Sequence, residues 1–88
     1  MNKYREQIEK IENDIYYGMG KYSQKVIDFI EETLERIDIE RICDDTLGSI
    51  EYDLSILLEI WNPELKEDIN ILYRIDSVLI DWRGYLKS

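Results

Sequence analysis

The 88-residue chain carries one cysteine, no histidine and a net charge of −9, with 44% hydrophobic and 35% charged residues. These values exclude an intrachain disulfide and any histidine-dependent catalytic or zinc site, and they are typical of a small folded domain rather than a disordered chain. We therefore expect one domain over residues 1–88. With four glycines and one proline, that domain should consist of a few long helices.

Neither a leader nor a membrane segment is predicted. The first residues, MNKYREQIEK, lack the apolar stretch of a signal peptide, and runs such as SILLEIW are far shorter than the roughly 18–20 residues that cross a bilayer. We expect a cytoplasmic protein that does not contact membranes.

The first half of the chain predicts two amphipathic helices. One should run from about residue 3 to Tyr17, with Gly18 just beyond it, because glycine adopts positive φ at low cost. The next should begin near Ser23, a possible N-cap. Asp38 either caps a third helix or lies within the second. The expected buried faces, spaced by three and four residues, are Tyr4, Ile8, Ile11 and Ile15, and then Val26, Phe29 or Ile30, Thr33 or Leu34, and Ile37.

The second half predicts two more helical faces, separated at WNPELK. There Asn62 is a possible cap, Pro63 suits a first helical position, and Glu64 suits the positive end of the helix dipole. The expected faces are Cys43, Leu47, Ile50, Leu54, Leu57 and Trp61, and then Leu65, Ile69, Leu72, Ile75, Leu79, Trp82 and Leu86. We predict an all-α fold, a small antiparallel bundle of four helices, or of three if the second and third merge.

Catalytic and metal-binding motifs are not evident. Glu31 and Glu35 share one helical face and either bind a hard cation or form a solvated face, the latter favoured with Glu32 pairing to Arg36. Cys43 is expected to be a buried, inert thiol, since the neighbouring aspartates would raise its pKa. Asp76 is expected to point partly inward and pair with an arginine or tyrosine. We predict no enzyme activity, no cofactor and no metal.

The negative charge is concentrated in the middle of the chain. Residues 28–68 contain fourteen acids and three bases, a net charge of −11, whereas residues 1–27 and 69–88 each carry +1. Such a segment should repel nucleic acid and attract a basic protein. We interpret the chain as an acidic inhibitor, in character an immunity protein or antitoxin that neutralises a basic nuclease toxin. The predicted partner-binding residues are Glu31, Glu35, Asp38, Glu40, Asp44, Asp45, Glu51, Tyr52 and Asp53.

Two alternatives stay open at this point. One is a phage-type inhibitor that mimics nucleic acid to block a defence system, although a duplex mimic would more often spread its acids along its length. The other is a structural or regulatory subunit without inhibitory activity. It would self-associate through a second apolar side of the last helix, formed by Ile71, Val78 and Tyr85 at seven-residue spacing.

Overall fold

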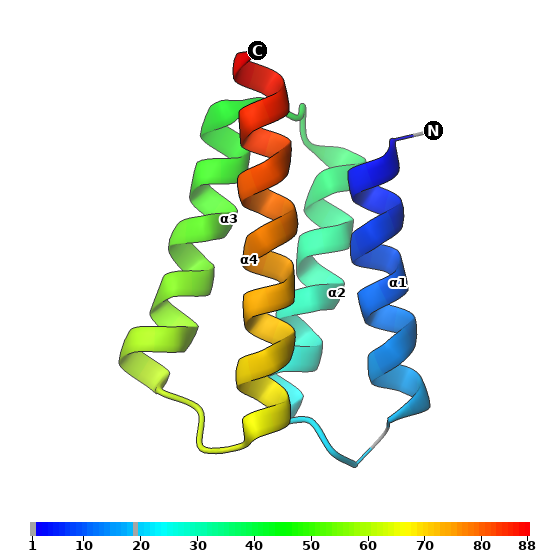
Figure 1. Cartoon of the computed structure of the whole chain (residues 1–88), viewed down its shortest axis with the longest axis vertical. Coiled ribbons are helices and arrows are strands. Elements are labelled where there is room, and N and C mark those ends of the chain that lie inside the picture. Colours follow the sequence, from blue (N-terminus) through cyan, green and yellow to red (C-terminus); the bar gives the residue numbers. More distant parts are fainter. Residues whose placement is uncertain (1, 19) are drawn as a thin grey trace.

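A computed structural model describes residues 2–18 and 20–88, and these residues form an antiparallel four-helix bundle. The helices are α1 (Lys3–Tyr17), α2 (Gln24–Ile39), α3 (Asp44–Ile56) and α4 (Lys66–Lys87), and a π-helical turn, η1 (Leu57–Trp61), extends α3. Successive helices run in opposite directions, so that both chain ends lie at one end of the bundle (Figure 1). The second and third helices are separate, because α2 continues through Asp38 to Ile39 before the chain turns.

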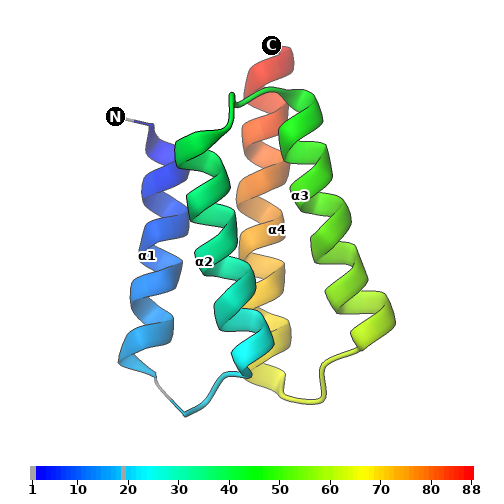
Figure 2. The same ribbon diagram turned by 180° about the vertical axis from the view of Figure 1, so that it is seen from behind.

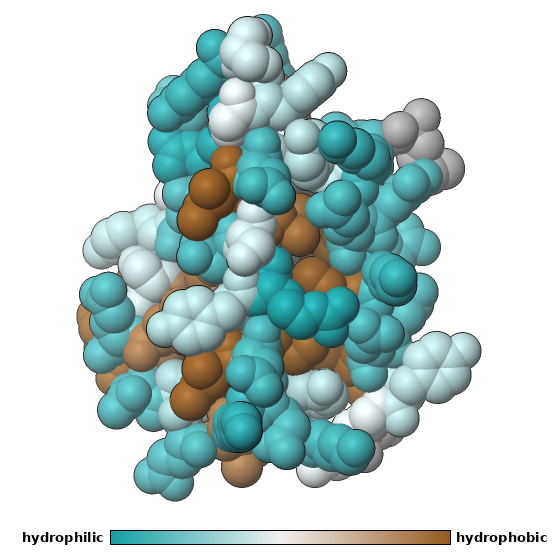
Figure 3. Space-filling view, in the orientation of Figure 1, coloured by the Kyte–Doolittle hydropathy of each residue, from teal (hydrophilic) through white to brown (hydrophobic). Residues whose placement is uncertain are grey.

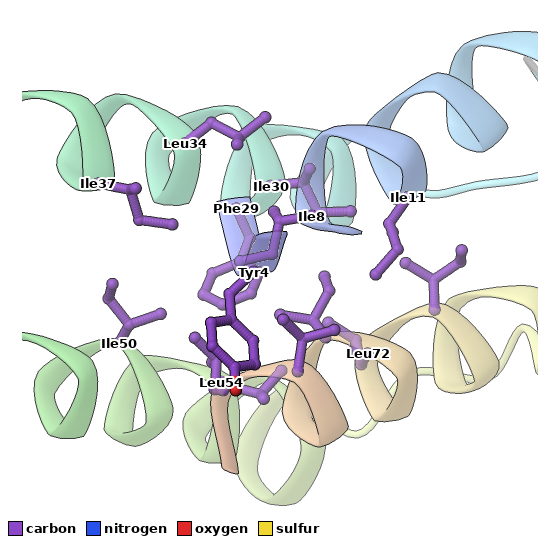
Figure 4. Close-up of a cluster of buried hydrophobic side chains, with 14 of the residues drawn as sticks. Tyr4, Ile8, Ile11, Phe29, Ile30, Leu34, Ile37, Ile50, Leu54 and Leu72 are labelled. Atoms are coloured by element: carbon purple, nitrogen blue, oxygen red, sulfur yellow. The ribbon is translucent and has the colours of Figure 1, made fainter. Parts of the chain in front are cut away.

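Most residues of the predicted apolar faces meet in one core, but Leu65 and Leu86 at the two ends of the last predicted face are exposed. Figure 4 shows side chains from all four helices pointing into the space between them. The ring of Tyr4 on α1 stacks on Trp82 of α4 with centroids 5.5 Å apart, and Trp82 is almost fully buried. Burial of these faces removes apolar surface from water, which is the main force holding the helices together. The core members are Tyr4, Ile8, Ile11, Ile15, Val26, Phe29, Ile30, Leu34, Ile37, Leu47, Ile50, Leu54, Ile71, Leu72, Ile75, Val78, Leu79 and Trp82.

The turn between α1 and α2 differs from the expectation in two respects. Gly18 ends α1 with a φ of −101°, and the left-handed conformation belongs instead to Gly20, with a φ of 94°. Ser23 is the N-cap of α2, but its side chain does not cap its own helix. Its amide and hydroxyl donate to the carboxylate of Asp68, which is fully buried at the start of α4. A buried carboxylate needs such donors, so this contact joins two helix ends.

The boundary at WNPELK falls where expected, but its residues have other roles. Asn62 is left-handed, with a φ of 54°, and its amide donates to the carbonyl of Leu57 to close η1. Asparagine tolerates this conformation better than most residues. Pro63 is buried in the connection, and α4 begins only at Lys66. The prediction that Asn62 caps the last helix and that Pro63 is its first residue is therefore wrong.

The second apolar side of α4 is part of the core. Ile71 and Val78 are 2% and 8% exposed, because α4 packs closely against both α1 and α3. Only Tyr85 of the predicted self-association surface is exposed. The prediction that these three residues form one interface is therefore wrong for Ile71 and Val78. Among the described residues, no helix combines the length and apolar character needed to span a membrane.

The four helices are not packed equally. Close backbone packing joins α1 to α2, α1 to α4 and α3 to α4, but α2 and α3 lack comparable packing. Figure 2 shows α3 leaning away from α2 toward the end of the bundle where η1 lies. Side chains rather than backbone therefore form most of the connection between α2 and α3.

Candidate functional site

The predicted partner-binding residues do not share one face of the bundle. Their contacts place six of them at three helix borders, and the other three contact none of these borders. Glu31 and Asp38 contact α1, Asp44 and Glu51 contact α4, and Glu40 and Asp53 share Arg36 where α2 faces α3. Glu35 is exposed on α2, and Asp45 and Tyr52 are exposed on α3. The continuous acidic surface that the sequence suggested is therefore divided by the bundle geometry.

At the border of α1 and α2, both predicted acids have partners within the protein. Glu31 accepts a hydrogen bond from the Tyr16 hydroxyl, which raises the pKa of Tyr16 to about 12. Asp38 accepts from Arg5, with the guanidinium Nε 2.6 Å from one carboxylate oxygen. This hydrogen bond lowers the pKa of Asp38. The two acids thus help to join α1 to α2.

At the border of α3 and α4, Arg83 holds two acids. Its Nε lies 2.9 Å from Asp44 and its Nη1 lies 2.7 Å from Glu51. The hydrogen bond from Arg83 lowers the pKa of Asp44. Only 20% of the Glu51 side chain is exposed, and its second oxygen is buried with no hydrogen-bond partner among the described residues. Glu51 is therefore part of the packed structure, whereas 47% of the Asp44 side chain stays exposed.

Where α2 faces α3, Arg36 forms the principal polar bridge. It contacts Glu40 on its own side at 2.9 Å, and reaches across to Asp53 at 3.2 Å and Ser49 at 3.1 Å. The expected pairing of Arg36 with Glu32 is therefore wrong. Glu40 and Asp53 remain about half exposed despite their contacts with Arg36.

A hollow lies beside this bridge, and the charge pattern of the sequence did not identify it. It has a volume of about 280 Å³, and it is open to solvent between α2 and the junction of α3 with η1. A second hollow shares Glu32 with it and extends along α2 to Ile39, which is 74% exposed. We call the two hollows together the open border; its lining residues are Lys25, Asp28, Phe29, Glu32, Glu35, Arg36, Ile39, Glu40, Asp53, Ile56 and Leu57.

Three exposed carboxylates follow one edge of the open border. Asp28, Glu32 and Glu35 are spaced by four and three residues on α2, and none has an ion-pair partner in the described part of the chain. Sequence reasoning selected Glu35 and missed Asp28 and Glu32. The helical spacing of these acids, beside the apolar face that includes Phe29, was the signal that would have identified them.

Cys43 occupies a different position from the one predicted. It is half-buried at the N-cap of α3 rather than buried on the apolar face. Hydrogen bonding to the Thr46 hydroxyl, supported by the amides of Thr46 and Asp45, lowers the pKa of the Cys43 thiol. The charge of Asp45 does raise the Cys43 pKa, as expected, but the hydrogen bonds from Thr46 and the amides at the helix N-terminus outweigh it, so the predicted net increase is wrong.

Asp76 lies partly inward, as predicted, but among the described residues it lacks the predicted arginine or tyrosine partner. It is half-buried, with no hydrogen-bond partner among residues 2–18 and 20–88. Burial and the nearby charge of Glu51 raise the pKa of the Asp76 carboxyl. The fully buried acid is Asp68, which is held by Ser23.

The described residues contain no group of three or more Cys, Asp or Glu side chains arranged to hold a metal ion. Comparisons of the chain with protein-family models, curated proteins and solved structures found no significant match. The functional argument therefore rests on the shape and charge of the open border.

Proposed function

We propose that this protein is an acidic inhibitor that binds a basic protein, in the manner of an immunity protein or antitoxin that neutralises a nuclease toxin in the cytoplasm of the producing cell. One observation carries the proposal. Asp28, Glu32 and Glu35 form an exposed row without ion-pair partners among the described residues, beside an apolar hollow. Nucleases must be cationic where they hold phosphate, so they present a surface complementary to such a row.

Charge and apolar area have different roles in this proposal. The acidic row would steer a cationic partner toward the inhibitor and accelerate association, whereas burial of apolar side chains would supply most of the lasting affinity. Five acids and two bases line the open border, a net charge of −3. That excess is local, and it remains after Arg36 has paired with Glu40 and Asp53.

The proposal is tested by capture followed by reconstitution. The immobilised protein is incubated with lysate of the source organism at low salt, and bound proteins are eluted by increasing salt and identified. The eluted basic protein is then purified, and its cleavage of DNA and RNA is measured with and without the inhibitor. We expect stoichiometric inhibition that weakens as salt rises.

A matched pair of triple variants serves as the control. Asp28→Asn, Glu32→Gln and Glu35→Gln remove the row, and Glu6→Gln, Glu64→Gln and Asp81→Asn remove the same charge from exposed sites elsewhere. Only the first variant should lose inhibition. A captured protein without nuclease activity, or a nuclease that the inhibitor leaves active, would contradict the proposed function. Capture of a nucleic-acid-binding defence protein would favour the nucleic-acid mimic instead.

A further inference from the structure

The open border is bounded by two side-chain bridges, both supplied by cations of α2. Arg36 crosses to Asp53 and Ser49. Lys25 crosses to η1, where its Nζ lies 5.7 Å from the centroid of the Trp61 ring. Between these bridges the first hollow is lined by Phe29 and by apolar residues of α3 and η1. Both bridges therefore connect α2 to the segment formed by α3 and η1 that lines the hollow.

The lining of this hollow fits a protein side chain better than a small molecule. Small-molecule sites usually enclose most of their ligand, whereas this hollow of about 280 Å³ is open to solvent. Phe29, Ile56 and Leu57 provide its apolar surface, and Ile56 is half-exposed without belonging to the packed core. Phe29 is only 9% exposed, so the accessible apolar surface comes mainly from Ile56 and Leu57, and a partner's side chain can cover it.

The π-helical turn enlarges this apolar wall. A π-turn widens the helix by one residue per turn and occurs frequently at functional sites. Here it leaves Ile60 77% exposed, close along the chain to the half-buried Trp61. Hydrophobic side chains reach the surface at the lower left of Figure 3, over the end of α3 and η1. Exposed apolar side chains therefore occur on η1 as well as in the hollow.

The charges around the hollow favour a cationic occupant. Asp28 and Glu32 lie on the α2 side and Asp53, which Arg36 contacts, lies on the α3 side. Three acids therefore outweigh the single lysine, Lys25, in the lining. A second copy of this chain would bring a net charge of −9 against these acids, which opposes self-association. A complementary occupant presents one large apolar side chain with lysine or arginine next to it.

We propose that the open border is a docking groove for one amphipathic, basic segment of a partner protein. A large apolar side chain of that segment enters between Phe29 and Leu57, and its flanking cations contact Asp28, Glu32 and Asp53. This inference rests on the proposed inhibitory function, and it specifies which segment of the partner is bound. The buried apolar contact fixes the position of the segment, and the acids on either side favour cationic partners.

The inference is tested with a defined peptide. The probe is a short amphipathic peptide with leucine and tryptophan on one face and lysine and arginine on the other, titrated into the isotopically labelled protein. Backbone amide NMR shifts should change along α2, the second half of α3 and η1, and not along α1. A peptide of the same composition in scrambled order, which has no apolar face, should bind about tenfold or more weakly because it cannot fill the hollow.

Two matched pairs of variants separate the groove from general charge attraction. The pair Asp28→Asn with Glu32→Gln should weaken peptide binding about tenfold, and the pair Glu6→Gln with Asp81→Asn, with the same net charge, should weaken it less than about twofold. Ile56→Ala should weaken binding about fivefold or more, whereas Ile80→Ala, an exposed isoleucine of α4, should leave binding unchanged. Far-UV circular dichroism checks that each variant keeps its helices.

Three results would overturn the groove. Equal losses from the two charge pairs would show that the peptide senses only net charge. Shifts centred on α1 or α4 would place the peptide elsewhere, and concentration-dependent shifts without peptide would assign the surface to a second copy. The two proposals fail separately: a captured nuclease still inhibited by the Ile56→Ala and Asp28→Asn/Glu32→Gln variants overturns the groove alone. Peptide binding in the groove without any inhibited nuclease overturns the inhibitory function alone.

Discussion

Two borders of the bundle, α3 with α4 and α2 with α3, are each bridged by an arginine that holds two acids. At the first border, Arg83 holds Asp44 and Glu51 over closely packed helices; the Asp44 side chain is 47% exposed, but the Glu51 side chain is only 20% exposed. At the open border, Arg36 holds Glu40 and Asp53, which are 44% and 51% exposed. The same ion-pair chemistry therefore closes one border and leaves the other accessible.

This difference shows what separates a structural acid from an available one. An acid beside packed helices has lost much of its contact with water and depends on its arginine, so it belongs to the fold. An acid at the open border stays hydrated, and its ion pair with arginine contributes little energy. A cation of a partner protein can therefore replace that arginine. The count of acids in residues 28–68 does not distinguish these two situations, and the packing of the helices does.

The largest expected effect is on the free energy of unfolding, and it comes from replacing leucine by alanine in the core and at the open border. Leu79→Ala removes a fully buried side chain of α4 and should lower the free energy of unfolding by about 2–5 kcal/mol, because it leaves a cavity. Leu57→Ala, at the half-exposed open border, should cost about 1 kcal/mol. Urea unfolding followed by circular dichroism measures both. Equal costs would show that the open border is packed as tightly as the core.

Removal of the two bridging arginines should also cost different amounts of stability, with the larger loss at the border of α3 and α4. Arg83→Gln leaves the mostly buried Glu51 without its cation, and a buried acceptor without a partner costs about 1–3 kcal/mol. Arg36→Gln leaves Glu40 and Asp53 in water, where exposed pairs contribute about 0–1 kcal/mol. The urea midpoint should therefore fall further for Arg83→Gln. A larger loss for Arg36→Gln would reverse the assignment of the two borders.

The smallest effect is a difference in pH dependence. The hydrogen bond from Arg83 lowers the pKa of Asp44 below its unfolded value of about 3.9. This contribution is therefore present above that value, and it is lost as pH falls through the lower, folded pKa. The stability deficit of Arg83→Gln should be largest near neutral pH and should shrink below about pH 4. Thermal unfolding of both proteins across this range provides the measurement, and a deficit independent of pH would contradict it.

Several features of the fold were predictable from local pattern. The spacing of Tyr4, Ile8, Ile11 and Ile15 predicted α1 and its buried face, because an amphipathic helix places such residues on one side. The seven-residue spacing of Ile71 and Val78 indicated a second apolar side on α4. The sequence could not show whether other helices or a partner would cover that side. Packing against both α1 and α3 decided it.

The candidate site was only partly predictable. The excess of acids between residues 28 and 68 was visible in the composition, and Glu35, Glu40 and Asp53 do lie at the open border. Asp44 and Glu51 were selected by charge alone, and the choice of their partner, Arg83, depends on how α4 crosses α3. Charge patterning reveals how many acids a segment carries, but not which cations distant segments will bring to them.

The sequence by itself determined the helices, their buried faces and the location of the negative charge, because helical periodicity and charge are properties of nearby residues. Only the tertiary structure decided which acids are paired within the fold, that α2 and α3 remain apart, and that Phe29, Ile56 and Leu57 line a hollow between them. These features depend on contacts between residues distant along the chain, and those contacts exist only once the helices have packed.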